Sequence, residues 1–132
     1  MDSRKTNGYE DLTVWQLAMD LAVDCHRLSK QFPSIDRSGF EASLFQTAML
    51  LPEYIADAHA RSSSSVYLEN ISLALGTVAR VETCILLAER MRFCNGEQRK
   101  QIMDKLNSVR WLLVRLRNAF NRRGISDEVA VS

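Results

Sequence analysis

Apolar residues recur at alternating spacings of four and three between residues 63 and 91. The apolar positions of this seam are Tyr67, Ile71, Ala74, Val78, Val81, Ile85 and Ala88. Such spacing places the side chains on one face of a long helix. An apolar seam of this length needs other helices to cover it.

The rest of the chain supplies three further stretches with the same periodicity. The pattern predicts four helices, at about residues 11–31, 37–61, 64–93 and 97–123. The links between them are short, and short links favour antiparallel neighbours. The predicted fold is therefore all-α, an antiparallel up-down-up-down four-helix bundle.

The domain limits follow from these helices. The bundle domain is predicted to cover residues 11–124. Polar residues 1–10 are predicted to form a flexible N-terminal arm, and residues 125–132 a flexible tail.

Breaker and capping residues refine the helix ends. Pro52 lies inside the second apolar series, so we expect a kink there rather than a break. Ser63 is placed to cap the third helix. Gly76 lies within that helix, and close approach of another helix is the usual compensation for a glycine there. Asn95-Gly96 is expected to end the third helix and Gly124 the fourth.

Composition narrows the class of protein. The chain has 132 residues, of which 46% are hydrophobic and 25% charged, which suits one ordinary globular domain. The N-terminus has no apolar stretch typical of a signal peptide, and the uncharged run 42–52 is too short to cross a bilayer. Three cysteines without paired spacing favour reduced thiols. We therefore expect a cytoplasmic location and no membrane partner.

Charge is unevenly spread along the chain. Residues 97–123 contain eight lysines and arginines against two acids, a net charge of +6. The remainder has nine basic and fourteen acidic residues, a net charge of −5. This polarity indicates an anionic partner, or acidic and basic surfaces that meet between subunits. A solvated basic helix explains it equally well.

Trp111 is the least expected residue of the fourth helix, because the helical period places it opposite the core series. Three readings stay open: a subunit interface, a platform for stacking nucleic-acid bases, or a locally packed ring. The cations grouped with it as candidate interface or nucleic-acid contacts are Arg99, Lys100, Arg110, Arg115, Arg117 and Arg122.

Other polar groups give no catalytic constellation. Glu82 lies close to the apolar seam, so we expect it to be partly buried and paired with an arginine of the fourth helix or of another subunit. Glu53 and Asp57 are four residues apart beside His59, which most simply makes a solvated face. No metal-ligand spacing, phosphate-binding loop or nucleophile–base signature is present. We therefore predict no enzyme activity, no cofactor and no metal site.

Several dispersed motifs carry a resemblance to a known family. They are residues 9–18 (YEDLTVWQLA), Phe32-Pro33, Leu51-Pro52 with Ile55-Ala56-Asp57 and Arg61, and Ala74-Leu75-Gly76-Thr77-Val78-Ala79 with Val81-Glu82-Thr83. In this order they resemble the small four-helix-bundle proteins encoded by intervening sequences of 23S rRNA genes. That family, once labelled S23 ribosomal proteins, is related in structure to the accessory variability proteins of diversity-generating retroelements.

The resemblance implies a four-helix bundle that assembles into a closed homo-oligomeric ring, typically a pentamer. It implies no catalytic site. The function of the family is usually described as unknown, with nucleic-acid binding suspected.

The chain departs from the family pattern in its second helix. The family often has two arginines where this chain has Phe45 and Gln46, and an asparagine where it has Tyr54. Loss of the arginines weakens the case for RNA binding through this face, and Phe45 and Tyr54 favour apolar contact there.

Taken with the resemblance, these features favour a non-enzymatic, homo-oligomeric binding or scaffold module. The alternative is an RNA- or DNA-binding ring, or an accessory subunit of a nucleic-acid enzyme such as a reverse transcriptase, that uses the basic fourth helix. The expected partners are other copies of the chain, and structured RNA, DNA or a partner protein.

Overall fold

The protein is all-α in the part that the structure describes. A computed structural model of the chain describes residues 9, 12–33, 39–61 and 63–131, with side chains as far as residue 122. Within these residues there are four helices and no strands, which confirms the predicted class. The helices are α1 (Thr13–Ser29), α2 (Phe40–Ala60), α3 (Ser64–Arg90) and α4 (Gly96–Val131).

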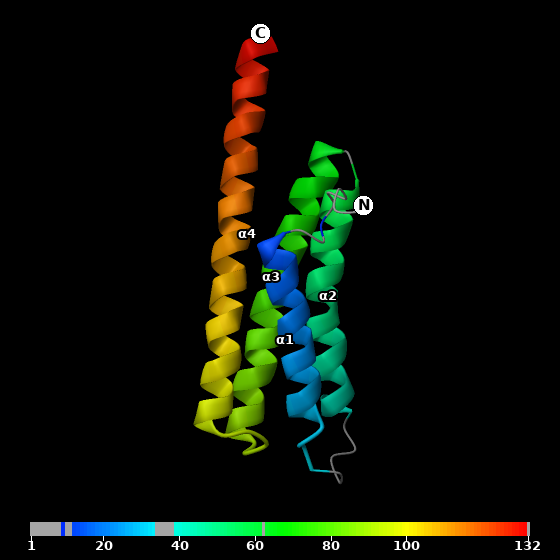
Figure 1. Cartoon of the computed structure of the whole chain (residues 1–132), viewed down its shortest axis with the longest axis vertical. Helices are drawn as coiled ribbons and strands as arrows, with labels where there is room; N and C mark the ends of the chain where they lie inside the picture. Colours follow the sequence, from blue (N-terminus) through cyan, green and yellow to red (C-terminus); the bar gives the residue numbers. More distant parts are fainter. Residues whose placement is uncertain (1–8, 10–11, 34–38, 62, 132) are drawn as a thin grey trace, which may run out of the picture.

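Each helix contacts two others. α1 packs on α2, α2 on α3, α3 on α4, and α4 on α1. Among the described residues the diagonal pairs α1 with α3 and α2 with α4 do not touch through their backbones, so the helices surround one shared core. The four axes run side by side, and α4 extends beyond the other three at its C-terminal end (Figure 1).

Aromatic clusters close the two ends of the core. Phe32 stacks on Phe40 with ring centroids 5.4 Å apart. The ring centroid of Phe93 lies 5.3 Å from that of Phe32. This cluster joins the end of α1, the start of α2 and the end of α3. At the other end, the ring centroid of Tyr67 in α3 lies 4.5 Å from that of Phe120 in α4 and 5.0 Å from that of His59 in α2.

The seam of α3 forms the centre of the core. Its six aliphatic positions, from Ile71 to Ala88, are fully buried. By length and composition alone α3 is also apolar enough to cross a membrane. Its buried face packs on α2 and α4, however, and both Glu82 and Glu89 form ion pairs with α4. α3 is thus accounted for as a core helix.

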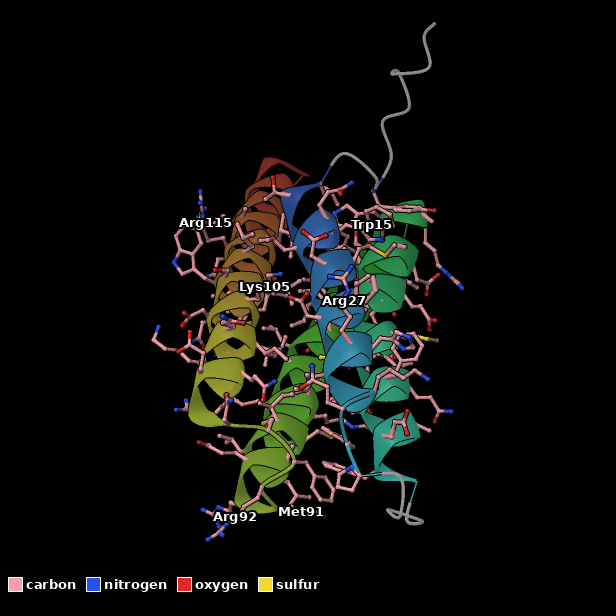
Figure 2. All side chains as sticks on the ribbon, turned by 60° about the horizontal axis from the view of Figure 1, so that its bottom comes forward. Trp15, Arg27, Met91, Arg92, Lys105 and Arg115 are labelled. Atoms are coloured by element: carbon pink, nitrogen blue, oxygen red, sulfur yellow. The ribbon has the colours of Figure 1, made fainter. Side chains whose placement is uncertain are left out.

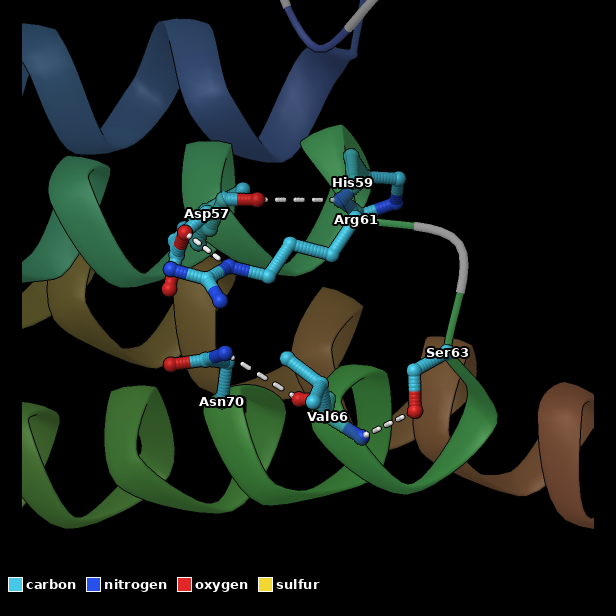
Figure 3. Close-up of polar contacts among 7 residues, drawn as sticks. Asp57, His59, Arg61, Ser63, Val66 and Asn70 are labelled. Carbon is cyan, nitrogen blue, oxygen red and sulfur yellow. Dashed lines mark hydrogen bonds and ion pairs between the residues drawn. The ribbon is translucent and has the colours of Figure 1, made fainter.

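Two sequence predictions within the helices are confirmed. α2 continues through Pro52, which is buried, so the helix does not break there; the expected kink stays a prediction. Ser63 caps α3, because its Oγ accepts a hydrogen bond from the N–H of Val66 at 3.4 Å (Figure 3).

The prediction for Gly76 is wrong within this chain. A Cβ placed on Gly76 would meet no atom within 4 Å, and the residue is exposed. Gly76 is two residues from each of the core residues Ala74 and Val78. Each residue turns a helix by about 100°, so Gly76 lies on the side of α3 opposite the core. No described helix approaches it.

The link between α3 and α4 also differs from the prediction. α3 ends at Arg90 in a Schellman motif, in which Arg92 adopts a left-handed conformation with φ of 64°. The N–H of Phe93 donates to the carbonyl of Ala88 at 2.8 Å. Asn95 instead begins α4: its side chain accepts from the N–H of Gln98, whose side chain accepts from the N–H of Asn95. This reciprocal capping box explains why Asn95-Gly96 starts a helix rather than ending one.

The fourth helix is longer than predicted. It continues to Val131, so the prediction that Gly124 ends it is wrong. Residues 125–131 are helical, and the flexibility expected for 125–132 stays a prediction. A glycine costs a helix interior only about 1 kcal/mol relative to alanine, and no proline follows. The other helices are shorter than predicted: 13–29 against 11–31, 40–60 against 37–61, and 64–90 against 64–93. Apart from Tyr9, the predicted arm lies outside the described residues.

Candidate interaction surface on the fourth helix

α4 presents two contrasting sides. Its core side consists of Ile102, Leu106, Val109 and Leu113, all buried against α1 and α3. Trp111 lies between the last two along the chain and points the opposite way, because one helical residue turns the side chain by about 100°. Its side chain is 59% exposed, the largest value among the exposed large hydrophobic residues that the structure describes.

The surroundings of Trp111 combine apolar surface with one cation. The guanidinium carbon of Arg115 lies 4.6 Å from the centroid of the indole, which is cation–π geometry. On the side facing α1, Trp111 borders an open hollow whose other lining residues are Leu17, Asn107, Ser108 and Leu112. Arg115 stands at the outer edge of α4, away from the other helices (Figure 2).

Two arginines of α4 that flank the core form ion pairs with glutamates of α3. Arg99 pairs with Glu89 at 2.8 Å, and Arg110 pairs with Glu82 at 2.9 Å. Glu82 is partly buried, with 28% of its side chain exposed. The structure therefore gives Glu82 a partner of the kind that the sequence led us to expect, an arginine of the fourth helix.

Two lysines of α4 are paired as well. Lys105 forms an ion pair with Asp24 of α1, and its side chain bridges the two helices (Figure 2). Lys100 pairs with Asp104 one turn along α4 at 3.0 Å, where both side chains are exposed. Four of the cations counted in the +6 segment thus have a carboxylate within this chain.

The second half of α4 differs from the first. Arg115, Arg117 and Arg122 have no ion pair with any residue that the structure describes. Arg115 and Arg122 are exposed and line an open groove between the start of α1 and α4, together with Leu12, Leu112 and Leu116. The positive charge available to a partner therefore lies in this half.

The candidate apolar contacts of α2 are made largely within the chain. The ring of Phe45 lies 4.8 Å from that of His26 in α1. Tyr54 is half-buried and packs against the core. Both residues thus make contacts inside the bundle.

The acidic residues near the end of α2 belong to local structure. Asp57 accepts from the Nε of Arg61 at 2.8 Å, and Nδ1 of His59 lies 3.0 Å from the carbonyl of Ile55 (Figure 3). Glu53 is exposed. In the described part of the chain, no three His, Cys, Asp or Glu side chains are grouped to hold a metal ion.

The three cysteines are free thiols. Burial raises the pKa of Cys25 to about 12, with a smaller contribution from the nearby charge of Asp24. Burial also raises the pKa of the Cys84 and Cys94 thiols. Thiols in such surroundings stay protonated at neutral pH and are poor nucleophiles.

Sequence reasoning did not single out the exposed apolar residues of the other helices. On α1 these are Met19 and Val23, which are 40% and 44% exposed. On and after α3 they are Leu73, Leu86, Leu87 and Met91. The signal was present, because each of these residues falls outside the core series of its own helix.

Two comparisons with known proteins bear on this chain. The family model described as 23S rRNA-intervening sequence protein matches residues 10–115. No curated protein matches the chain. The matched segment includes Trp111 and Arg115 and stops before Arg122.

Proposed function

The chain belongs to the 23S rRNA-intervening sequence protein family, and we propose that it acts as a homo-oligomeric binding or scaffold module rather than as an enzyme. In this proposal an antiparallel up-down-up-down bundle is the building block, and the bundles assemble into a closed ring in the cytoplasm. A pentamer is the ring size that the family resemblance favours.

The exposed indole of Trp111 is the observation that carries the proposal. An aromatic side chain of this size gains most from burial, and aromatic residues are enriched at protein interfaces. Here the ring has a cation on one side and apolar surface on the other, and the core of its own bundle is already complete without it. A subunit interface accounts for all three features.

Nucleic-acid binding is the second candidate, and Arg115 beside Trp111 is the observation that favours it. A base can stack on an exposed indole while an arginine contacts the phosphate. The pairing of Arg99, Lys105 and Arg110 with carboxylates of α1 and α3 counts against it, because those cations are not free for phosphates. A role beside a reverse transcriptase would use the same surface.

Size-exclusion chromatography with light scattering tests the first candidate directly. We expect a single species with the mass of a small closed ring at micromolar concentration, and a monomer would contradict the proposal. Binding to structured RNA, measured between about 50 and 200 mM salt, tests the second, since phosphate contacts weaken steeply over that range. Absent or salt-insensitive binding counts against it.

A further inference from the structure

We propose that the outer faces of α4 and α1 are the two halves of one repeated contact between copies of this chain. The tryptophan surface is Asp104, Trp111 and Arg115 on α4. The methionine surface is Met19, Asp20, Val23 and Arg27 on α1. This inference rests on the proposed self-association and names the surfaces that make it.

The methionine surface is built to accept a large ring. Met19 and Val23 are 40% and 44% exposed, and one helical turn separates them. Methionine is flexible and makes favourable contacts with aromatic rings, so Met19 can adapt to an indole. Asp20 and Arg27 are exposed on the same face of α1 and form no ion pair with a described residue.

The charges of the two surfaces are complementary in one orientation. Along α1 the order is acid, apolar, cation: Asp20, Val23, Arg27. Along α4 the order is the same: Asp104, Trp111, Arg115. If the two helices meet antiparallel, Trp111 lies opposite Val23, Arg115 faces Asp20, and Arg27 is directed towards Asp104. Parallel packing would place like charges together, which costs free energy.

A second copy is the occupant, because one chain cannot make this contact with itself. α1 and α4 are packed neighbours, while Val23 and Trp111 are exposed and both point away from the core. The two surfaces face different directions on one bundle. A contact between unlike surfaces repeats from copy to copy, and it ends only when a ring closes.

Mixing two broken variants tests the pairing of unlike surfaces. Trp111→Asp disrupts the tryptophan surface and leaves the methionine surface intact. Val23→Asp disrupts the methionine surface and leaves the tryptophan surface intact. We expect each variant alone to lose self-association by roughly 30-fold or more, as for an interface hot spot. Mixed in equal amounts, the two variants keep one intact pair of surfaces, so light scattering should show a one-to-one dimer.

A charge reversal tests the predicted orientation. Arg115→Glu and Asp20→Arg should each weaken assembly by about tenfold, because each places like charges opposite one another. The double variant restores an opposite pair and should recover most of the loss. Failure of the double variant to recover would overturn the antiparallel pairing.

Leu73→Asp is the matched control, since Leu73 on α3 is 43% exposed, as Val23 is on α1. We expect it to assemble like the unmodified chain, and circular dichroism melts should show that all variants fold. If Leu73→Asp dissociates the oligomer and Val23→Asp does not, the inference is overturned while self-association stands. If the unmodified chain is a monomer, the proposed function itself fails.

Discussion

The two sides of α4 differ in how far this chain covers their apolar residues. Leu113 is fully buried, and Trp111, only two residues away, is 59% exposed. The same helical period determines both positions. The described residues cover Leu113 completely, whereas they leave more than half of Trp111 exposed.

The same division applies to the charges of α4. Arg110 and Lys105 have carboxylate partners on α3 and α1, and both ion pairs are partly shielded from water. Among the described residues, Arg115 has no carboxylate partner and lies over the indole of Trp111. Residues with partners inside the chain therefore stabilise the bundle, and residues without them are available for association.

The largest expected effect is on the buried side. Leu113→Ala should lower the free energy of unfolding by about 2–5 kcal/mol, because it removes buried methyl groups and leaves a cavity. Trp111→Ala should change the stability of the isolated bundle by less than about 0.5 kcal/mol. Urea unfolding at a concentration where the protein is monomeric measures both. Equal losses of unfolding free energy for the two variants would contradict the difference between the core side and the outer side of α4.

The buried thiol of Cys25 gives the next effect, at alkaline pH. Its pKa of about 12 in the folded protein exceeds the ordinary value of 9.0, so between these values the unfolded chain loses a proton that the folded chain keeps. The stability from this group is complete below pH 9 and falls as the pH rises towards 12, by about 1.4 kcal/mol per pH unit.

Cys25→Ala isolates this contribution. Other groups also titrate above pH 9, so the measured quantity is the difference in alkaline slope between the unmodified chain and the variant. Urea unfolding at several pH values should show a shallower slope for Cys25→Ala. Identical slopes would mean that the thiol reaches solvent before the bundle unfolds.

The half-buried ion pair comes third. Glu82→Ala should lower the free energy of unfolding by about 1 kcal/mol, because Arg110 then stays partly buried without its carboxylate. This is the upper end of the range for ion pairs with this exposure. Asp104→Ala removes the fully surface pair with Lys100 and should cost less than about 0.5 kcal/mol. Thermal melts of the two variants, at a concentration where the protein is monomeric, compare the two ion pairs without the contribution of Asp104 to the tryptophan surface. An unchanged melting temperature for Glu82→Ala would show that this pair adds nothing.

Periodicity predicted what depends on the average direction of a side chain. It located the seam from Ile71 to Ala88, the outward position of Trp111 and the paired position of Glu82. Local chemistry predicted the cap at Ser63, because the capping bond lies within one turn of the chain. These features need no knowledge of how the helices pack.

The errors share a different cause. Asn95-Gly96 fits either end of a helix, and only the bonds between Asn95 and Gln98 decide between them. Gly76 was expected to contact a helix because glycine often does, but its direction on α3 is outward. Gly124 was expected to end α4, although one glycine is too small a penalty to do so. In each case a residue type was weighed without its surroundings.

The smallest effect concerns a surface residue whose conformation is fixed by this chain alone. Arg92 is exposed, yet the Schellman motif after α3 holds it at φ of 64°, a conformation that costs a residue with a Cβ roughly 1 kcal/mol. Arg92→Gly relieves that cost but adds flexibility to the unfolded chain, so we expect a gain of only about 0.5 kcal/mol. Arg90→Gly, within the last turn of α3, should instead destabilise the protein. A gain of stability for Arg92→Gly with a loss for Arg90→Gly, measured by urea unfolding, would show that backbone conformation determines the effect at position 92. A loss of stability for both variants would mean that the Arg92 side chain itself has a partner.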